Sequence, residues 1–382
     1  MTTAMSKVLN PLDAREISAL AHSEGPCVSM QLPDYKPGAG EGTRSAHLRD
    51  MTQAAIEQLR NFQLPVGNDR LIQSVAHLME IPQTTPGGPG MALFCAPGLE
   101  LAYGAAGIAP ELLTVGTRFH ILPLLSHAYA AHEVFVLGLG KKHVRLWHYN
   151  NGECAEEPLP AGIASGLEAF EGFDKPDHDL ENRSTGGPAT GTRRKIRFGT
   201  MSDRESHQEY LHHFFEHIAR GLKDKVGETP LFLIGVHEEL AQFRRVAGRL
   251  RVFETEWNEN AEYCAIDAIA ARTKEAAFRE YYRLGETAMR GIQEITAKLT
   301  GDPVAILRAA HQGRVHRLFV AEQTHMPAHA DEGAFAKVRK GEDLANAAVI
   351  ETLRTSGEVF ALPGANLPEL PEGSAIAAIL RY

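Results

Sequence analysis

One segment of the sequence combines glycines and cations in a pattern that suits phosphate binding. Residues 183–197 contain five basic residues and no acidic ones, and they include Ser184-Thr-Gly-Gly-Pro-Ala-Thr-Gly-Thr192. Glycines let backbone amides approach a polyanion closely, and Arg and Lys attract it. The residues that we expect to contact RNA or another phosphate are Gly186, Gly187, Arg193, Arg194, Lys195 and Arg197.

The segment just before this one has the opposite charge. Residues 153–181 contain nine acidic residues and one basic residue, Lys175. A second interpretation of residues 183–200 is therefore a surface loop whose cations only offset the acidic stretch. Long loops without apolar periodicity are usually functional or disordered, so the sequence leaves both interpretations open.

Other chemical patterns are weak. Gly138-Leu-Gly140-Lys141 lacks the third glycine and the following helix of a dinucleotide fingerprint. His213 and His217 have the spacing of a metal-binding pair, but Phe214 occupies the position where a zincin carries its Glu. The sequence contains no Gly-x-Ser-x-Gly nucleophile elbow. We therefore predict no catalytic residue, no metal ligand and no cofactor, and leave open whether the protein is an enzyme.

Composition excludes several classes of protein. The chain has 382 residues, 43% of them apolar, which is typical of a folded protein with two or three domains. The net charge of −9 disfavours a generally basic nucleic-acid binder but allows a local basic patch. Four scattered cysteines favour reduced thiols in a cytoplasmic protein. No signal peptide and no apolar run long enough to span a membrane are visible.

The elements around the cationic segment indicate an α/β domain. Two strand-like stretches, 132–138 and 144–149, precede the acidic residues. Ser202, followed three residues later by Glu205, forms a capping-box pattern that predicts the start of a helix. The apolar run 230–236 is typical of a buried parallel strand. A helix is expected from about 238 to 247.

The flanking segments also combine helical and strand patterns. In the first, apolar residues predict helices near 17–21, 48–62 and 69–79 and strands at 27–33 and 91–95. The third is expected to contain a long helix over 263–299, a helix that restarts at Asp302-Pro303, and a helix over 343–353. Strands are expected at 315–321, 358–362 and 375–382. We predict three α/β domains, 1–125, 126–260 and 261–382.

Four stretches, in this order, carry a family resemblance. They are Pro26-Cys-Val-Ser-Met-Gln-Leu-Pro33, the stretch from Phe135 to Trp147, the stretch from Asp343 to Pro363, and the terminal Ala-Ile-Leu-Arg-Tyr382. With them the chain resembles the archaeo-eukaryotic class-one release factor and Pelota superfamily, and in particular its third bacterial subgroup. The resemblance implies a ribonuclease-H-like middle domain, an L7Ae-like C-terminal domain, and a role at the ribosome in termination or in rescue of stalled complexes.

The resemblance also has a consequence for the cationic segment. Release factors carry a Gly-Gly-Gln tripeptide there, which assists hydrolysis of peptidyl-tRNA, whereas this chain has Gly186-Gly187-Pro188. Proline has neither a side-chain amide nor a backbone N–H. We therefore expect contact with ribosomal RNA or tRNA without ordinary Gly-Gly-Gln catalysis. The alternatives are a hydrolase acting on peptidyl-tRNA or as a nuclease, and a metal- or ligand-binding module.

Overall fold

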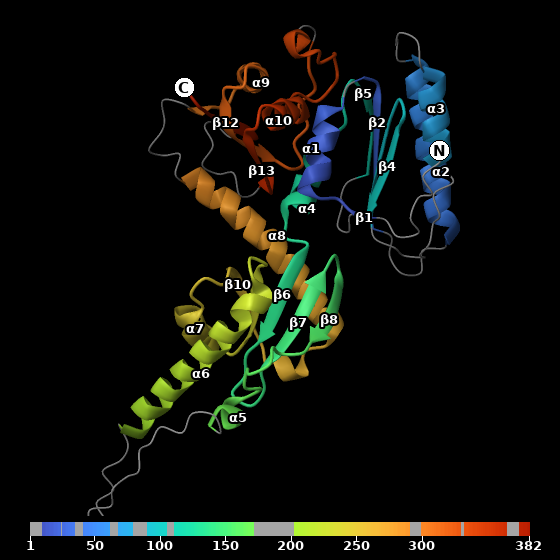
Figure 1. Ribbon diagram of the computed structural model, residues 1–382. Coiled ribbons are helices and arrows are strands. Elements are labelled where there is room, and N and C mark those ends of the chain that lie inside the picture. The colour runs from blue at the N-terminus through green and yellow to red at the C-terminus, as the bar shows by residue number, and fades with distance from the viewer. Residues whose placement is uncertain are drawn as a thin grey trace, which may run out of the picture. The chain divides into compact units, whose positions relative to one another are not determined.

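The chain forms two compact units. One consists of Met1–Ala130 together with Tyr281–Tyr382, and the other is Ala131–Glu280. The computed structural model describes residues 10–23, 25–34, 41–61, 68–78, 90–104, 111–171, 202–290, 299–329, 332–364 and 374–382. We call the first unit the split unit and the second the middle unit. The predicted alternation of helices and strands is confirmed in both (Figure 1).

The middle unit is built on a five-stranded sheet of order β10-β9-β6-β7-β8. Its strands are β6 (Glu133–Gly138), β7 (Arg145–Asn150), β8 (Glu153–Glu157), β9 (Leu231–Gly235) and β10 (Val252–Asn258). Strands β6, β9 and β10 are parallel, and β7 and β8 are antiparallel to their neighbours. The run that predicted a buried parallel strand is β9, in which every residue is buried.

Helices cover both faces of this sheet. They are α5 (Leu167–Glu171), α6 (Ser202–Val226), α7 (His237–Val246), a 3₁₀ turn (Ala261–Tyr263) and the first part of α8 (Ile266–Arg290). Phe214 and Phe243 of α6 and α7 pack with Leu233 on one face. On the other face, Ile269 of α8 packs with Phe232 and Trp147. Alternate residues of a strand point to opposite faces, so β9 contributes to both cores.

The split unit contains two sheets. The first has the order β1-β4-β3-β2-β5 and the second the order β11-β14-β12-β13. The first comprises β1 (Asn10–Pro11), β2 (Cys27–Leu32), β3 (Met91–Ala96), β4 (Leu99–Gly104) and β5 (Leu112–Gly116). The second comprises β11 (Leu299–Thr300), β12 (Val315–Ala321), β13 (Glu358–Leu362) and β14 (Ile376–Leu380).

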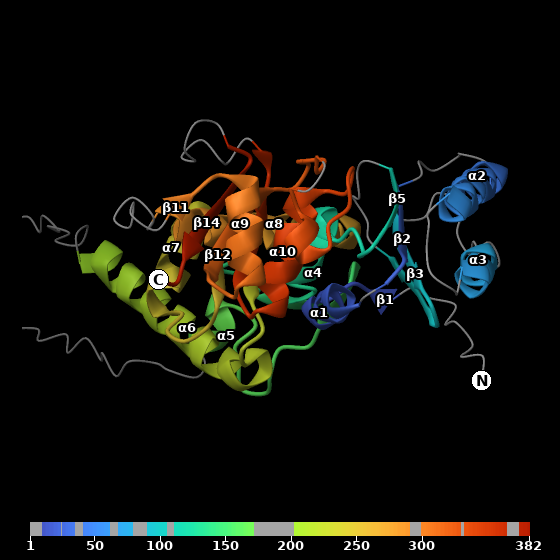
Figure 2. The same ribbon diagram turned by 90° about the horizontal axis from the view of Figure 1, so that it is seen from above.

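Helices of the split unit pack on these sheets (Figure 2). They are α1 (Ala14–His22), α2 (Glu41–Asn61), α3 (Asn68–His77), α4 (Leu125–Tyr129), α9 (Pro303–His311) and α10 (Leu344–Arg354), with 3₁₀ turns at Leu122–Leu124 and Ala334–Ala336. Leu48 of α2 and Leu71 of α3 bury one face of the first sheet. On the second sheet, Met289 near the end of α8 packs against Phe319.

The two sheets of the split unit share one apolar core. This core contains Ile17 of α1 and Phe94 of β3 together with Leu307 of α9 and Val349 of α10. Figure 2 shows α1 beside α10. Residues from opposite ends of the chain therefore bury the same apolar surface.

Local signals in the sequence located several element boundaries. Asp302 Oδ1 accepts a hydrogen bond from Val304 N at 3.1 Å at the start of α9. Asp343 Oδ1 accepts one from Ala345 N at 2.8 Å at the start of α10. Gly313 follows the end of α9 with a φ of +69°, a conformation that glycine adopts readily after a helix. The predicted restart at Asp302-Pro303 and the predicted helix that starts near Asp343 are thus confirmed.

Other elements differ from the sequence-based expectation. The acidic stretch contains an edge strand, β8, which the sequence did not reveal because it is paired through its backbone and carries little apolar pattern. Strands β4 and β5 were also missed. The long helix expected over 263–299 begins at Ile266, and its described part ends at Arg290. In the described part of the chain, no helix has the length and apolar character needed to cross a membrane.

Candidate functional site

The predicted RNA-contacting residues all fall in the segment that joins α5 to α6. Gly186, Gly187, Arg193, Arg194, Lys195 and Arg197 lie outside the described residues. The structure does describe both helices at the base of this segment, since α5 ends at Glu171 and α6 begins at Ser202. The geometry of that base shows how the segment is attached to the middle unit.

An aromatic contact fixes α5 against α6. The Phe170 ring is buried, and its centroid lies 5.5 Å from that of Tyr210 and 5.6 Å from that of Phe214. The His217 ring lies at 5.2 Å on the same side of α6. A helix as short as α5 is not stable by itself. These ring contacts therefore determine where the N-terminal arm of the 172–201 segment starts.

A second contact fixes α6 to the turn before α5. His217 Nε2 lies 2.9 Å from the carbonyl oxygen of Gly162. One turn further, Gly221 leaves room for Ile163, because a Cβ on Gly221 would come within 2.5 Å of Ile163 Cγ1. The base of the segment is thus held at two points along α6.

These contacts also bear on the possible metal pair. The His217 ring is hydrogen-bonded to the carbonyl oxygen of Gly162. His213 Nδ1 lies 3.8 Å from Glu216 Oε2. Among the residues that the structure describes, no three His, Cys, Asp or Glu side chains are grouped so that they could hold a metal ion. The pair is part of the α6 surface and its packing.

The glycines of Gly138-Leu-Gly140-Lys141 serve packing. A Cβ on Gly138 would lie 2.7 Å from both Trp147 Cζ3 and Ala261 Cβ. The carbonyl oxygen of Lys141 accepts a hydrogen bond from Leu167 N at 2.8 Å. This turn therefore contacts the start of α5 and does not form the strand-to-helix phosphate loop of a dinucleotide site.

Part of the acidic stretch is paired inside the middle unit. Glu156 forms a two-point contact with Arg145, at 2.8 and 2.6 Å, and Glu157 lies 2.8 Å from Lys225 Nζ. Each of these cations lowers the pKa of its carboxyl partner. Two of the acidic residues that precede the cationic segment are therefore already matched by cations outside that segment.

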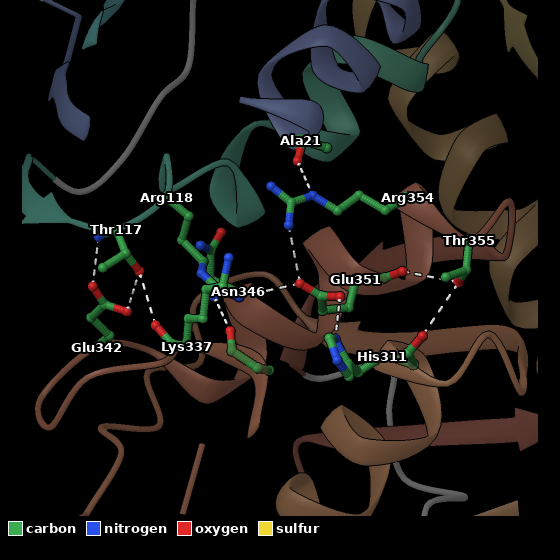
Figure 3. Close-up of polar contacts among 12 residues, drawn as sticks. Ala21, Thr117, Arg118, His311, Lys337, Glu342, Asn346, Glu351, Arg354 and Thr355 are labelled. Atoms are coloured by element: carbon green, nitrogen blue, oxygen red, sulfur yellow. Dashed lines mark hydrogen bonds and ion pairs between the residues drawn. The ribbon is translucent and has the colours of Figure 1, made fainter. Parts of the chain in front are cut away.

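The split unit contains a second polar feature that sequence reasoning missed. We call Thr117, Arg118, Glu342, Asn346, Glu351 and Arg354 the buried polar cluster; Figure 3 shows it. Glu342 Oε1 accepts a hydrogen bond from Thr117 N at 2.6 Å, and its Oε2 lies 2.9 Å from Thr117 Oγ1. Gly116 makes room for this carboxylate, because a Cβ there would lie 2.9 Å from Glu342 Oε1.

Arg118 lies at the centre of the buried polar cluster and is only 8% exposed. Its Nη2 donates to the carbonyl oxygen of Ala336 at 2.6 Å, and its Nη1 lies 3.7 Å from Glu351 Oε1. Burial lowers the pKa of this guanidinium, while the carboxylates of Glu342 and Glu351 raise it. A buried charge is tolerated only when it is paired in this way.

The remaining members of the buried polar cluster bind backbone groups of the N-terminal segment. Asn346 Oδ1 accepts from Ile121 N at 2.9 Å, and its Nδ2 donates to Phe119 O at 2.9 Å. Arg354 Nε donates to Ala21 O at 2.6 Å. The only sequence signal was that polar residues interrupt the apolar surface of the helix at 344–354.

Residues 134–314 match the model of the bacterial archaeo-eukaryotic release factor family 3. This segment is similar to that family over slightly less than half of the chain. The match includes all of Arg183–Arg197 and both helices at its base, so the family resemblance predicted from the sequence is confirmed. No curated protein matches the chain.

Solved structures of translation factors align over most of the chain. Archaeal translation termination factor aRF1 aligns with 13% identity and a TM-score of 0.25, over 97% of both chains. Pelota from Archaeoglobus fulgidus aligns with 11% identity and a TM-score of 0.36, over 98% of this chain and 94% of that one. At TM-scores this low, the likeness carries no argument about the fold or activity of the chain.

Proposed function

We propose that this protein acts at the ribosome, in translation termination or in the rescue of stalled complexes. The observation that carries the proposal is the family 3 match over residues 134–314, which contains the Gly-Gly-Pro sequence and the cationic residues in one segment. In this proposal Arg193, Arg194, Lys195 and Arg197 attract RNA phosphates, and Gly186 and Gly187 allow close backbone approach.

We further propose that the middle segment binds without hydrolysing peptidyl-tRNA by the ordinary route. A Gln in the third position of Gly-Gly-Gln has a side-chain amide and a backbone N–H, and Pro188 has neither. Positioning a water for attack on an ester needs donors and acceptors of this kind. The protein would then occupy the ribosome and leave peptide release to another factor.

The three-domain division is part of the same proposal. Residues 1–125, 126–260 and 261–382 would be three α/β domains, the second ribonuclease-H-like and the third L7Ae-like, with the first and third packed on one common core. Its support is that β1–β5, β6–β10 and β11–β14 form one sheet each. A cytoplasmic location and the absence of a cofactor follow from this role and are also proposals.

Ribosome binding can be tested by co-sedimentation through a sucrose gradient at low salt. We expect the full-length protein to sediment with ribosomes, and the triple variant Arg193→Ala, Arg194→Ala, Lys195→Ala to lose most of this binding. The matched control replaces Lys223, Arg245 and Arg249, three exposed cations of the middle unit, by Ala. The proposal would be contradicted if the Arg193, Arg194, Lys195 triple variant bound ribosomes as well as the wild type. It would also be contradicted if no wild-type protein sedimented with ribosomes.

Catalysis can be tested with ribosomes that carry peptidyl-tRNA. We expect no peptide release by the wild type above the rate in buffer, because Pro188 lacks the needed groups. The variant Pro188→Gln restores the Gly-Gly-Gln tripeptide and reports whether proline is what prevents release. Release by the wild type that is lost on replacing Gly186 and Gly187 by Ala would favour the hydrolase alternative.

A further inference from the structure

A loop of the split unit presents cations to solvent on a protein that is acidic overall. Lys337, Arg339 and Lys340 are exposed and lie within four consecutive positions between β12 and α10. The described carboxylates of residues 332–343 make contacts with the protein. Glu342 binds Thr117, Asp343 caps α10, and Glu332 accepts a hydrogen bond from His329 N at 2.8 Å. The three cations are exposed, whereas Asp343 is buried and Glu332 and Glu342 are half-buried.

An exposed aromatic ring lies in the same loop. Phe335 is 36% exposed, and the guanidinium carbon of Arg308 lies 5.1 Å from its ring centroid. The His311 ring approaches edge-on, at 6.1 Å. Single-stranded RNA is commonly bound by stacking bases on aromatic rings or guanidinium planes beside cations that track the phosphates.

The backbone of this loop is held in a strained conformation. Lys337 has a φ of +57°, in the left-handed region that non-glycine residues rarely adopt. Arg118 donates to Ala336 O at 2.6 Å from inside the unit, and Thr117 Oγ1 lies 3.3 Å from Lys337 O. Gly333 O accepts from Ala336 N at 2.9 Å and from Val338 N at 3.0 Å.

The strained backbone at Lys337 and the buried guanidinium of Arg118 both need support from the residues around them. A left-handed non-glycine residue is strained and persists only when its surroundings hold it. A buried arginine also carries a desolvation cost. The buried polar cluster supplies that restraint, so the loop presents its cations and Phe335 in one fixed arrangement. A loop that only kept the surface solvated would need neither feature.

We propose that Lys337, Arg339, Lys340 and Phe335 form a binding surface for single-stranded RNA. The cations contact successive phosphates, and Phe335, with Arg308 against its ring, stacks on a base. In this proposal Arg118 is a positioning residue, because it acts on the RNA only through the loop. The surface shares no residue with the cationic segment of residues 183–197, so the proposal stands or falls independently of the function proposed above.

The test uses the full-length protein with Arg193, Arg194 and Lys195 already replaced by Ala, so that remaining RNA binding reports this surface. The probe is a fluorescein-labelled single-stranded RNA of about 12 nucleotides, within the range that a single-strand groove covers. Its fluorescence anisotropy is measured over a series of salt concentrations. The loop variant is Lys337→Gly, Arg339→Ala, Lys340→Ala, in which glycine accepts the positive φ without strain.

We expect the loop variant to bind at least about 10-fold more weakly and to lower the slope of log affinity on log salt by about 2, since each lost phosphate contact on a single strand contributes about 0.7. Phe335→Leu should weaken binding by about 5-fold or more while leaving the salt slope unchanged, because stacking is not ionic. The control triple Lys223→Ala, Arg245→Ala, Arg249→Ala removes the same charge and should change the affinity less than 3-fold, roughly the spread expected for unrelated surface charges.

Several results would overturn the proposal. The first is that the parent variant does not bind RNA. The second is that the control triple weakens binding as much as the loop variant does, and the third is that the loop variant binds as well as its parent. Thermal unfolding shows in each case that the variant is folded. Polyglutamate that competes as well as unlabelled RNA, together with unchanged binding by Phe335→Leu, would instead indicate an acidic protein partner. Because the parent variant already lacks Arg193, Arg194 and Lys195, this test does not depend on whether those residues bind the ribosome.

Discussion

At the scale of single residues, the structure is most informative about buried ionisable groups. His120 is 6% exposed, and its backbone N–H donates to Ser29 Oγ at 2.9 Å. Burial lowers the pKa of this imidazole to about 4. The charge of Asp343 opposes the shift and that of His325 adds to it. His120 is therefore neutral at pH 7 in the folded protein.

The pKa of His120 predicts that the split unit loses stability in mild acid. An unfolded histidine has a pKa near 6.5, so below that pH the unfolded chain binds a proton that folded His120 does not. Stability should fall as the pH decreases from about 6.5 to about 4, by roughly 3 kcal/mol at most. Urea unfolding followed by circular dichroism at pH 7 and pH 5 measures this loss.

The variant His120→Gln isolates the contribution of this histidine. It should reduce the loss of stability between pH 7 and pH 5 by about 2 kcal/mol, since one pKa unit corresponds to about 1.4 kcal/mol. His329→Gln, at an exposed position, serves as the control and should behave like the wild type. An unchanged pH dependence in His120→Gln would show that other groups cause the acid sensitivity.

At the scale of elements, the base of the cationic segment depends on tertiary contacts of a very short helix. Helix α5 has five residues, and its buried Phe170 contacts Tyr210, Phe214 and His217 of α6. Such a helix gains its stability from packing, since nucleation costs more than so few hydrogen bonds return. The attachment of the segment is therefore a property of the α5–α6 pair.

Phe170→Ala should destabilise the middle unit by about 3–5 kcal/mol, because it removes a buried ring and leaves a cavity. The variant Phe170→Leu fills most of that space and should cost less than about 1.5 kcal/mol. The two tryptophans of the chain, Trp147 and Trp257, both lie in the middle unit. Urea unfolding followed by tryptophan fluorescence thus reports this unit, and equal stability of the two variants would contradict the packing argument.

At the scale of the whole molecule, segments that are far apart in the sequence pack together in one unit. The chain enters the split unit, leaves it at Ala130 and returns at Tyr281. Its N-terminal and C-terminal parts share one core and the buried polar cluster, whose Thr117–Glu342 contact joins residues 225 positions apart. The middle unit has cores of its own on both faces of its sheet.

This arrangement predicts how fragments behave. A fragment of residues 131–280 should fold alone and show cooperative urea unfolding by tryptophan fluorescence. A fragment of residues 1–130 should not fold alone, because Ile17 and Phe94 would lose their partners in 281–382. Mixing it with a 281–382 fragment should restore native circular dichroism. Cooperative unfolding of 1–130 alone would contradict a shared core.

The sequence by itself determined the features that depend on neighbouring residues. The cap at Asp302, the helix that starts near Asp343 and the buried strand at 231–235 were predicted, because they rest on short-range hydrogen bonds and on local apolar pattern. The order of four short stretches was also enough to indicate the family that matches residues 134–314.

Only the tertiary structure decided which distant segments meet. The edge strand β8 has little apolar pattern and is defined by its pairing with β7. Arg118 and Glu351 are ordinary surface residue types in the sequence, and they become buried partners because two ends of the chain share a core. Burial and long-range pairing depend on all the surrounding residues at once, so no local pattern encodes them.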